Sequence, residues 1–318
     1  MAIIDREELL HLLDRRRFLI GSAALASISL MPWKALALSA APYRFMQGDF
    51  EVIVLSDGSL RLPLNIMATD ASPEQLADIA KRLGWSSGKA EPAANIPLLR
   101  KGSDLILIDN GSGNKFQPTA GKLAENLKAA GIEPGAVTKV VFTHAHPDHI
   151  WGTLTEGNKL FLPNATYFVG SAEWNFWTDP GLLSKMPAEM ADFVKGAQRD
   201  LGAVKGRVTM VKGSDEIVPG LSVLDTPGHT PGHISLEVAG GEGLIIAADA
   251  MSNEIISFEH PEWKFGFDAQ PDLAIENRKK LLDRAATDKV KMLGYHWTYP
   301  GVGFAERRGP AYVFARTS

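Results

Sequence analysis

The segment Lys139–Gly152, KVVFTHAHPDHIWG, limits what this chain can fold into more than any other part of it. Its apolar start predicts a short buried strand, after which four metal-type side chains follow within six residues: His144, His146, Asp148 and His149. Side chains two apart in extended backbone point the same way, so His144 and His146 can hold one cation. Asp148 and His149 turn elsewhere and can serve a second cation, because imidazole and carboxylate groups are ligands that zinc and its first-row neighbours prefer.

Three further metal-type side chains each follow a run that predicts a strand, over 221–225, 243–248 or 289–294. They are His229, Asp249 and His296. A lone histidine after a strand is usually a hydrogen-bonded structural residue. Four such places in one chain, counting the histidine segment, favour one shared metal site. Asp109, at the end of strand 104–109, can accept a hydrogen bond from a ligand imidazole, and His233 is interpreted as supporting or structural.

Composition excludes several classes of protein. The 318-residue chain is 45% hydrophobic and 22% charged, as soluble globular proteins are, and it has no cysteine. Disulfides and thiolate metal ligands are therefore impossible. The net charge is −4 and basic residues do not cluster, which argues against nucleic-acid partners and anionic membrane surfaces. No G-x-S-x-G motif competes with the histidines as a catalytic centre.

The first forty residues have the pattern of an export signal. Arg15-Arg16-Arg17-Phe18-Leu19 matches a twin-arginine motif, and the apolar run 20–31 and the small residues that end in Ala35-Leu36-Ala37 follow it. The apolar run is too short for a stable membrane anchor. We expect a cleaved signal over residues 1–40, a partner in the twin-arginine export machinery and a periplasmic or secreted protein. Residues 41–318 are expected to form one domain.

The periodicity of the remaining chain predicts a mixed α/β (α+β) protein. A hairpin is expected over Tyr43–Pro63 with its turn at Ser56-Asp57-Gly58, and helices are expected over 72–84, 119–130, 171–177, 187–201 and 271–285. Runs of short strands alternate with some of these helices. That order favours two sheets covered by helices over a plain parallel sheet.

The motifs THAHPDH and GHTPGH, with Asp249 and GYHWTYPG after them, resemble the metallo-β-lactamase fold hydrolases in order and spacing. The resemblance covers roughly Tyr43 to the C-terminus. YRFMQGDFEVIVLSDGSLRLP, PTAGKLAENLKAAG and HWTYPGVG are most similar to the methyl parathion hydrolase branch. The resemblance implies an αββα sandwich of two mixed sheets with two divalent metals.

The same resemblance assigns the ligands. It implies that one metal is held by His144, His146 and His229, and the other by Asp148, His149 and His296, with Asp249 bridging both. Two positions depart from the pattern: Ala248 stands where glycine is usual, and Asn110 replaces the usual threonine of a D-T-G loop. Neither change removes a ligand. Zinc is expected, with manganese, iron or cobalt as alternatives, because histidine and aspartate sites accept all four.

Two cations at such a site predict a hydrolase in which a metal-bridged hydroxide attacks a carbonyl carbon or phosphorus. Asp148 or Asp249 would carry a proton to the leaving group. Phe116, Trp177 and Phe193 are candidate pocket residues, although they are equally well explained as core aromatics. An apolar mouth would suit a small neutral substrate: a lactone, an aryl ester or an organophosphate triester.

Other functions stay open at this point. A β-lactamase or a glyoxalase-type thioesterase would use the same metal chemistry, although no added glutathione-binding region is evident. A metal-binding sensor without catalysis is a different class, and it predicts a closed coordination sphere. A homodimer is possible, because aromatic residues fall in a helical insert after Gly170.

Overall fold

The computed structural model describes residues 41–85 and 88–317. The predicted export signal over residues 1–40 lies outside the described residues. Within the described ranges, no helix combines the length and apolar character needed to cross a membrane.

Two seven-stranded mixed sheets form the centre of the protein. In spatial order, the first contains β1 (Tyr43–Gln47), β2 (Phe50–Ser59), β5 (Ala93–Lys101), β6 (Asp104–Ile108), β7 (Lys139–Phe142), β8 (Thr166–Gly170) and β9 (Val208–Val211). The second contains β10 (Glu216–Val218), β11 (Leu221–Asp225), β12 (Ile234–Val238), β13 (Leu244–Ala248), β14 (Lys291–Gly294), β15 (Val302–Arg308) and β16 (Ala311–Arg316). A small ribbon pairs β3 (Leu62–Pro63) with β4 (Lys89–Ala90). The strands from β6 to β9 run parallel, as do β13 and β14, and the other neighbours are antiparallel.

Alternation of side chains along the strands builds the layers. In β2, Val52 and Val54 join the cluster between the two sheets, whereas Ile53 and Leu55 join the cluster under the helices of the first sheet. Both faces of this strand are therefore buried, which explains its nearly continuous apolar sequence. A third cluster fills the space between the second sheet and its helices. The predicted αββα sandwich is confirmed.

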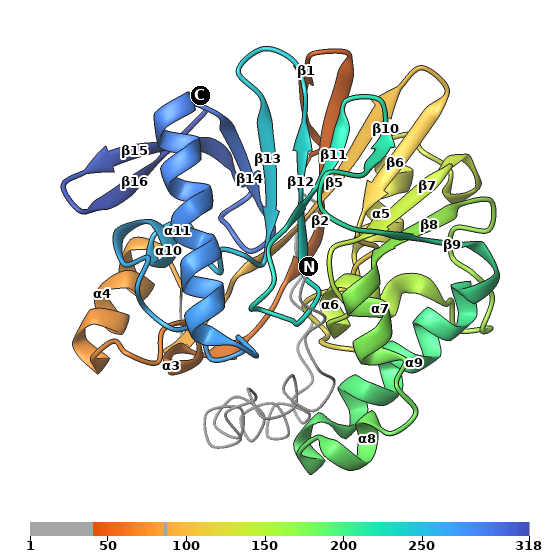
Figure 1. Cartoon of the computed structure of the whole chain (residues 1–318), viewed down its shortest axis with the longest axis horizontal. Coiled ribbons are helices and arrows are strands. Elements are labelled where there is room, and N and C mark those ends of the chain that lie inside the picture. The colour runs from red at the N-terminus through yellow and green to blue at the C-terminus, as the bar shows by residue number, and fades with distance from the viewer. Residues whose placement is uncertain (1–40, 86–87, 318) are drawn as a thin grey trace.

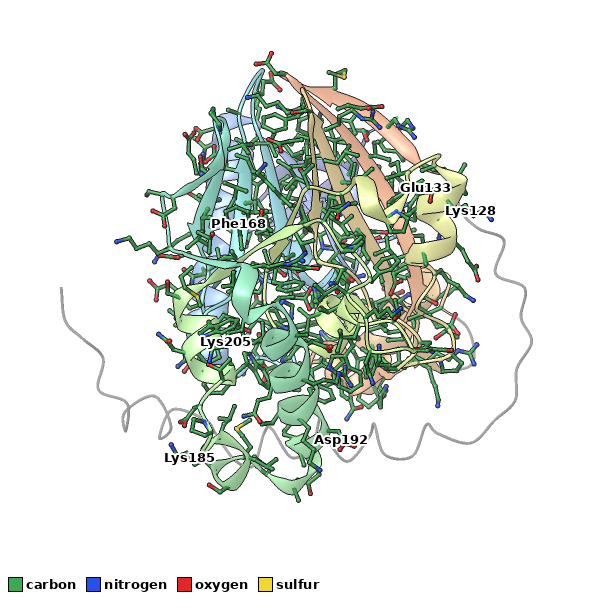
Figure 2. The ribbon with its side chains drawn as sticks, turned by 90° about the vertical axis from the view of Figure 1, so that its right-hand side faces the viewer. Lys128, Glu133, Phe168, Lys185, Asp192 and Lys205 are labelled. Carbon is green, nitrogen blue, oxygen red and sulfur yellow. The ribbon has the colours of Figure 1, made fainter. Side chains whose placement is uncertain are left out.

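Helices cover the outer faces of both sheets, and Figure 1 shows α11 on one side of the strands and α7 and α9 on the other. The α-helices are α3 (Leu64–Met67), α4 (Pro73–Arg82), α5 (Leu123–Ala129), α6 (Pro147–Ile150), α7 (Ser171–Trp177), α8 (Leu182–Lys185), α9 (Ala191–Val204), α10 (Ile256–Glu259) and α11 (Pro271–Asp288). Single 3-10 turns are η1 (Pro134–Ala136), η2 (Trp151–Thr153), η3 (Ala188–Met190) and η4 (Lys205–Arg207). In Figure 2, Lys185 and Asp192 lie at the tip of the helical insert, and Lys205 lies nearer the sheet.

Two predicted boundaries were wrong. The hairpin turn lies at Gly48–Asp49, between the paired residues Gln47 and Phe50, and not at Ser56-Asp57-Gly58. The latter residues stay within β2, where the pairing with β5 shifts register. The helix predicted from Thr119 begins only at Leu123, because the chain before it is tied to β2: Asp57 accepts hydrogen bonds from the N–H groups of Gly121 (3.1 Å) and Leu123 (2.8 Å).

Candidate metal centre

All seven predicted ligands meet at one edge of the sandwich, where strands of both sheets end. His144 and His146 follow β7, and α6 carries Asp148 and His149. The other three come from loops after strands of the second sheet: His229 after β11, Asp249 after β13 and His296 after β14. None of the seven is more than 8% exposed.

The ligand atoms form three overlapping groups, and the one of His144, His149 and Asp249 connects the other two. His144, His146 and His229 make the first donor group, and Asp148, His149 and His296 make the second donor group. In the first, His146 Nδ1 lies 3.1 Å from His144 Nε2 and 3.0 Å from His229 Nε2. Three nitrogens around one zinc ion at about 2.1 Å would be roughly 3.4 Å apart, so these separations are close to those around a single cation.

Asp249 lies between the two groups. Its Oδ2 atom is 3.3 Å from His229 Nε2 and 3.2 Å from His296 Nε2, and its Oδ1 atom is 3.4 Å from His149 Nε2. Asp148 Oδ2 is 3.3 Å from His296 Nε2 in the second donor group. The carboxylate of Asp249 is thus the one that can reach cations held by either group.

Fixed tautomers leave the ligand nitrogens free for a metal. The Nδ1 atoms of His149, His229 and His296 face oxygen atoms that can only accept, namely Asp109 Oδ2 (2.8 Å), Asp268 Oδ1 (3.0 Å) and the Ala93 carbonyl (2.8 Å). Each Nδ1 must therefore carry the proton, and each Nε2 presents its lone pair to the site.

Buried polar atoms without a partner mark the place of the cations. Asp148 Oδ2, His149 Nε2 and Asp249 Oδ1 have no hydrogen-bond partner within the protein. An unsatisfied buried polar atom costs about 1–3 kcal/mol, and divalent ions coordinated by these atoms would remove that cost. The residues present therefore fit two divalent cations.

The electrostatics of the site favour positive charge. Burial opposes protonation of His296, yet the carboxylates of Asp249 and Asp148 raise its pKa to about 10. Burial would raise the pKa of Asp249, but His296 and His149 hold it well below its usual range. Burial and the neighbouring imidazoles lower the pKa of His144 and His146, so both stay neutral ligands. A divalent cation supplies the charge that the protons on the second donor group otherwise provide.

Glu173 on α7 joins the two ligand loops, and sequence reasoning missed it. Its Oε1 atom accepts hydrogen bonds from the N–H of Ala145 (2.8 Å) and from Trp177 Nε1 (2.7 Å). Its Oε2 atom accepts from Thr230 Oγ1 (2.6 Å) and from the N–H of Gly232 (3.0 Å). A buried glutamate after a predicted strand gives no local signal, because its partners are distant in sequence.

His233 and the backbone of Ala248 position Asp249. His233 Nε2 accepts a hydrogen bond from the Asp249 N–H (3.1 Å), and burial lowers the pKa of His233 to about 3. His233 is therefore a neutral support, as the sequence interpretation had it. Ala248 has a positive φ of 46°, a conformation that costs a residue other than glycine about 1 kcal/mol. This explains why its place in the pattern normally belongs to glycine.

An apolar pocket opens onto the ligands. Phe116 and Phe193 line it, as predicted, together with Leu60, Leu62, Phe265 and Phe267. The prediction for Trp177 needs correction, because its side chain is only 2% exposed and its indole donates to Glu173 behind the pocket. The ring of Phe265 stacks on His229 at 5.6 Å. Phe265 and Phe267 follow no motif, so sequence reasoning did not single them out.

The arrangement defines a two-cation metal centre of mixed histidine and aspartate ligands on an αββα sandwich. The sequence profile of the Metallo-beta-lactamase superfamily matches residues 92–296, and the chain belongs to this superfamily.

Two N-acyl homoserine lactonases are similar to this chain in sequence. An N-acyl homoserine lactonase of a Bacillus species is 28% identical over 170 residues, which cover 53% of this chain and 59% of that protein. The chain thus spans less than two thirds of that curated relative. The N-acyl homoserine lactonase AttM of Agrobacterium fabrum is 31% identical over 137 residues, covering 40% of this chain and 46% of that protein.

Two solved structures match most of the chain. AidC, a dizinc quorum-quenching lactonase in complex with a product, is 28% identical with a TM-score of 0.81, and the match covers 87% of this chain and 98% of AidC. AbOPH, a hydrolase of the β-lactamase superfamily, is 30% identical with a TM-score of 0.81, and the match covers 88% and 98% of the two chains.

Proposed function

We propose that this protein hydrolyses neutral lactones, N-acyl homoserine lactones foremost, at a centre of two zinc ions. The observation that carries the proposal is the position of an apolar pocket directly over seven converging ligands. Relatives that are lactonases, and the dizinc lactonase AidC among similar structures, support the substrate class and the metal.

The chain's own residues divide the work. When bound, two divalent ions supply a water acidic enough to attack at neutral pH and a Lewis acid for the substrate's carbonyl oxygen. Phe116, Phe193 and Phe265 exclude water and hold the apolar part of the substrate. Asp148 lines the pocket beside the donor groups, so its carboxylate is placed to carry a proton to the leaving alkoxide.

The pocket also favours a second candidate reaction. Four of its lining side chains are phenylalanines, Phe116, Phe193, Phe265 and Phe267, which suit an aromatic leaving group. Aryl esters and organophosphate triesters are neutral and place such a group beside the reacting atom. We include their hydrolysis as a further activity of the same centre.

An activity panel on metal-reconstituted protein tests the proposal. Lactones, aryl esters, phosphotriesters, β-lactams and thioesters are compared, and metal content is measured at the same time. We expect two zinc ions per chain, turnover of lactones, loss of turnover on chelation and recovery with zinc. Turnover of β-lactams or thioesters alone would support those alternatives instead. One tightly held ion without any turnover would indicate a metal-binding sensor.

The location of the protein is a separate proposal. The twin-arginine pattern of residues 1–40 supports export to the periplasm or the medium, and twin-arginine export of folded proteins would suit an enzyme that receives its metal in the cytoplasm. Fractionation of the native host with an antibody to the mature chain tests this. Recovery of the mature protein in the cytosol alone would refute it. We also propose a homodimer, which size-exclusion chromatography of the same material tests.

A further inference from the structure

Arg278 on α11 is a buried cation that the proposed chemistry does not use. Arg278 is 1% exposed, and its guanidinium donates four hydrogen bonds. Nε donates to the Ala250 carbonyl (3.3 Å), Nη1 to the carbonyls of Pro261 (3.3 Å) and Trp263 (2.6 Å), and Nη2 to Asp268 Oδ2 (3.2 Å). Burying a charge is costly unless it is paired in this way, so its place needs a reason.

Every partner of Arg278 leads to the metal centre. Ala250 directly follows the bridging Asp249. Asp268 accepts the Nδ1–H of His229 (3.0 Å), which turns Nε2 of that ring toward the first donor group. Pro261 and Trp263 begin the segment that continues to Phe265, whose ring stacks on His229.

The segment 261–270 is also fastened to the His229 loop through its backbone. The N–H of Ala269 donates to the His229 carbonyl (3.0 Å), and the N–H of Gln270 donates to the Gly228 carbonyl (2.8 Å). Arg278 therefore fixes two neighbours of His229. One is Asp268, which orients the imidazole ring, and the other is the turn that carries Phe265, whose ring stacks on that imidazole.

The second donor group has a different support. His149 Nδ1 bonds to Asp109, and the other donors to Asp109 are the N–H (2.8 Å) and hydroxyl (2.7 Å) of Thr143. The hydrogen bonds of Arg278 reach no member of this group in the described chain. The one link to it is through Ala250, which follows the bridging Asp249, whereas the other three hydrogen bonds of Arg278 go to Asp268 and the segment beside His229. A change at Arg278 should therefore act more strongly on the first donor group than on the second.

We propose that Arg278 is a positioning residue for the first donor group: by fixing Asp268 and the segment 261–268, it sets the direction of His229 and with it the affinity of one of the two cations. The proposal rests on the metal centre described under the proposed function. This role needs the three separate nitrogens of a guanidinium, because an ammonium group has one nitrogen and cannot reach Ala250, Trp263 and Asp268 together.

Single-site backgrounds make the proposal testable. His296→Ala removes a ligand of the second donor group, and His146→Ala removes one of the first. Arg278→Lys is added to each background, and the zinc dissociation constant is measured by chelator competition. We expect zinc binding about tenfold weaker in the His296→Ala background, the lower end of the effect of losing an outer partner, because Asp268 remains but is no longer held. Binding in the His146→Ala background should weaken much less, because only the Ala250 contact leads toward the second donor group.

A matched control lies on the same helix. Arg284 is partly exposed and pairs with Glu237 on the second sheet, so Arg284→Lys should alter neither dissociation constant. Equal weakening in both backgrounds would show that Arg278 only stabilises the fold, and no change in either would overturn its role outright. If Arg278→Lys does not fold, Asp268→Asn in the two backgrounds takes its place, with the same selective loss expected. Absence of zinc binding by the unaltered protein would instead refute the proposed function.

Discussion

The first half of the metal centre comes from loops of the first sheet and the second half from loops of the second sheet. Both halves are supported by buried carboxylates, but the charge of these carboxylates is balanced differently. In the first half, Asp57, Asp109 and Glu173 accept hydrogen bonds from backbone N–H, hydroxyl, indole and imidazole groups. In the second half, Asp268 is paired with Arg278 and Glu254 with Arg316. Burial raises the pKa of all three first-half carboxylates. The buried acids of the first half are therefore supported by hydrogen bonds alone, and the two named acids of the second half are paired with arginines.

Asp249 is the residue that joins the halves, and its loss should have the largest effect. Asp249→Ala removes the carboxylate within reach of both donor groups. We expect both cations to be lost and turnover to fall by more than the roughly hundredfold effect of losing an outer partner. Metal analysis and kinetics on the purified variant check this. Two retained ions with normal turnover would show that the two donor groups bind their cations without Asp249.

Glu173→Gln tests how strongly the first half depends on its anionic support. The amide would turn an N–H₂ group toward two of the four donors, such as those of Thr230 and Gly232, and leave them buried without an acceptor. At about 2 kcal/mol for each donor, we expect a loss of about 4 kcal/mol in unfolding free energy. Urea unfolding measures it, with the exposed Glu189→Gln as control. A loss no larger than that of the control would contradict the assigned role.

The pH dependence of stability should differ between the two halves, and Asp57 shows the direction expected for the first. Its pKa is raised by burial from 3.8 to about 6, against the pull of the N–H groups of Ser112, Leu123 and Gly121. Between those values the folded chain holds a proton that the unfolded chain has released, so the contribution of Asp57 to stability falls as pH rises through this window.

The change amounts to at most about 3 kcal/mol, since one pKa unit is about 1.4 kcal/mol. The difference in unfolding free energy between the natural chain and Asp57→Asn, measured from pH 4 to pH 7, isolates it. A difference that stays constant or grows with pH would show that the N–H donors outweigh burial.

The smallest expected effect compares Asp109→Asn with Asp268→Asn. Asp109 offers its full negative charge to His149, whereas Arg278 already neutralises Asp268. Replacing Asp109 should therefore weaken zinc at the second donor group about a hundredfold, and replacing Asp268 should weaken the first about tenfold. The single-site backgrounds provide the measurement. Equal losses would mean that Arg278 does not offset the charge of Asp268.

The same contrast explains what could be predicted from the sequence. His144, His146, Asp148 and His149 lie within six residues, so their convergence follows from local backbone geometry. His229, Asp249 and His296 were found because each follows an apolar strand, but only the two-sheet fold brings them to the same edge.

Other features had no local signal. Glu173 contacts residues 28 and 59 positions away along the chain, and Arg278 and Asp268 meet only where α11 packs on the second sheet. Ser56-Asp57-Gly58 has a turn composition, yet it serves a register shift inside β2, because the carboxylate of Asp57 is needed beneath the next loop. Trp177 was misplaced because the direction of a helical face depends on packing that the sequence does not state.

The spread of the ligands over both sheets has a consequence for how the protein matures. Residues 144 and 296 meet only after the strands between them have been laid down and the sandwich has closed. A cation that needs this full ligand set would therefore bind the folded chain and not the unfolded one. At a thousandfold excess over its dissociation constant it adds about 4 kcal/mol to the folded state. Uptake of both cations would thus follow closure of the sandwich, because the complete ligand set exists only in the folded chain.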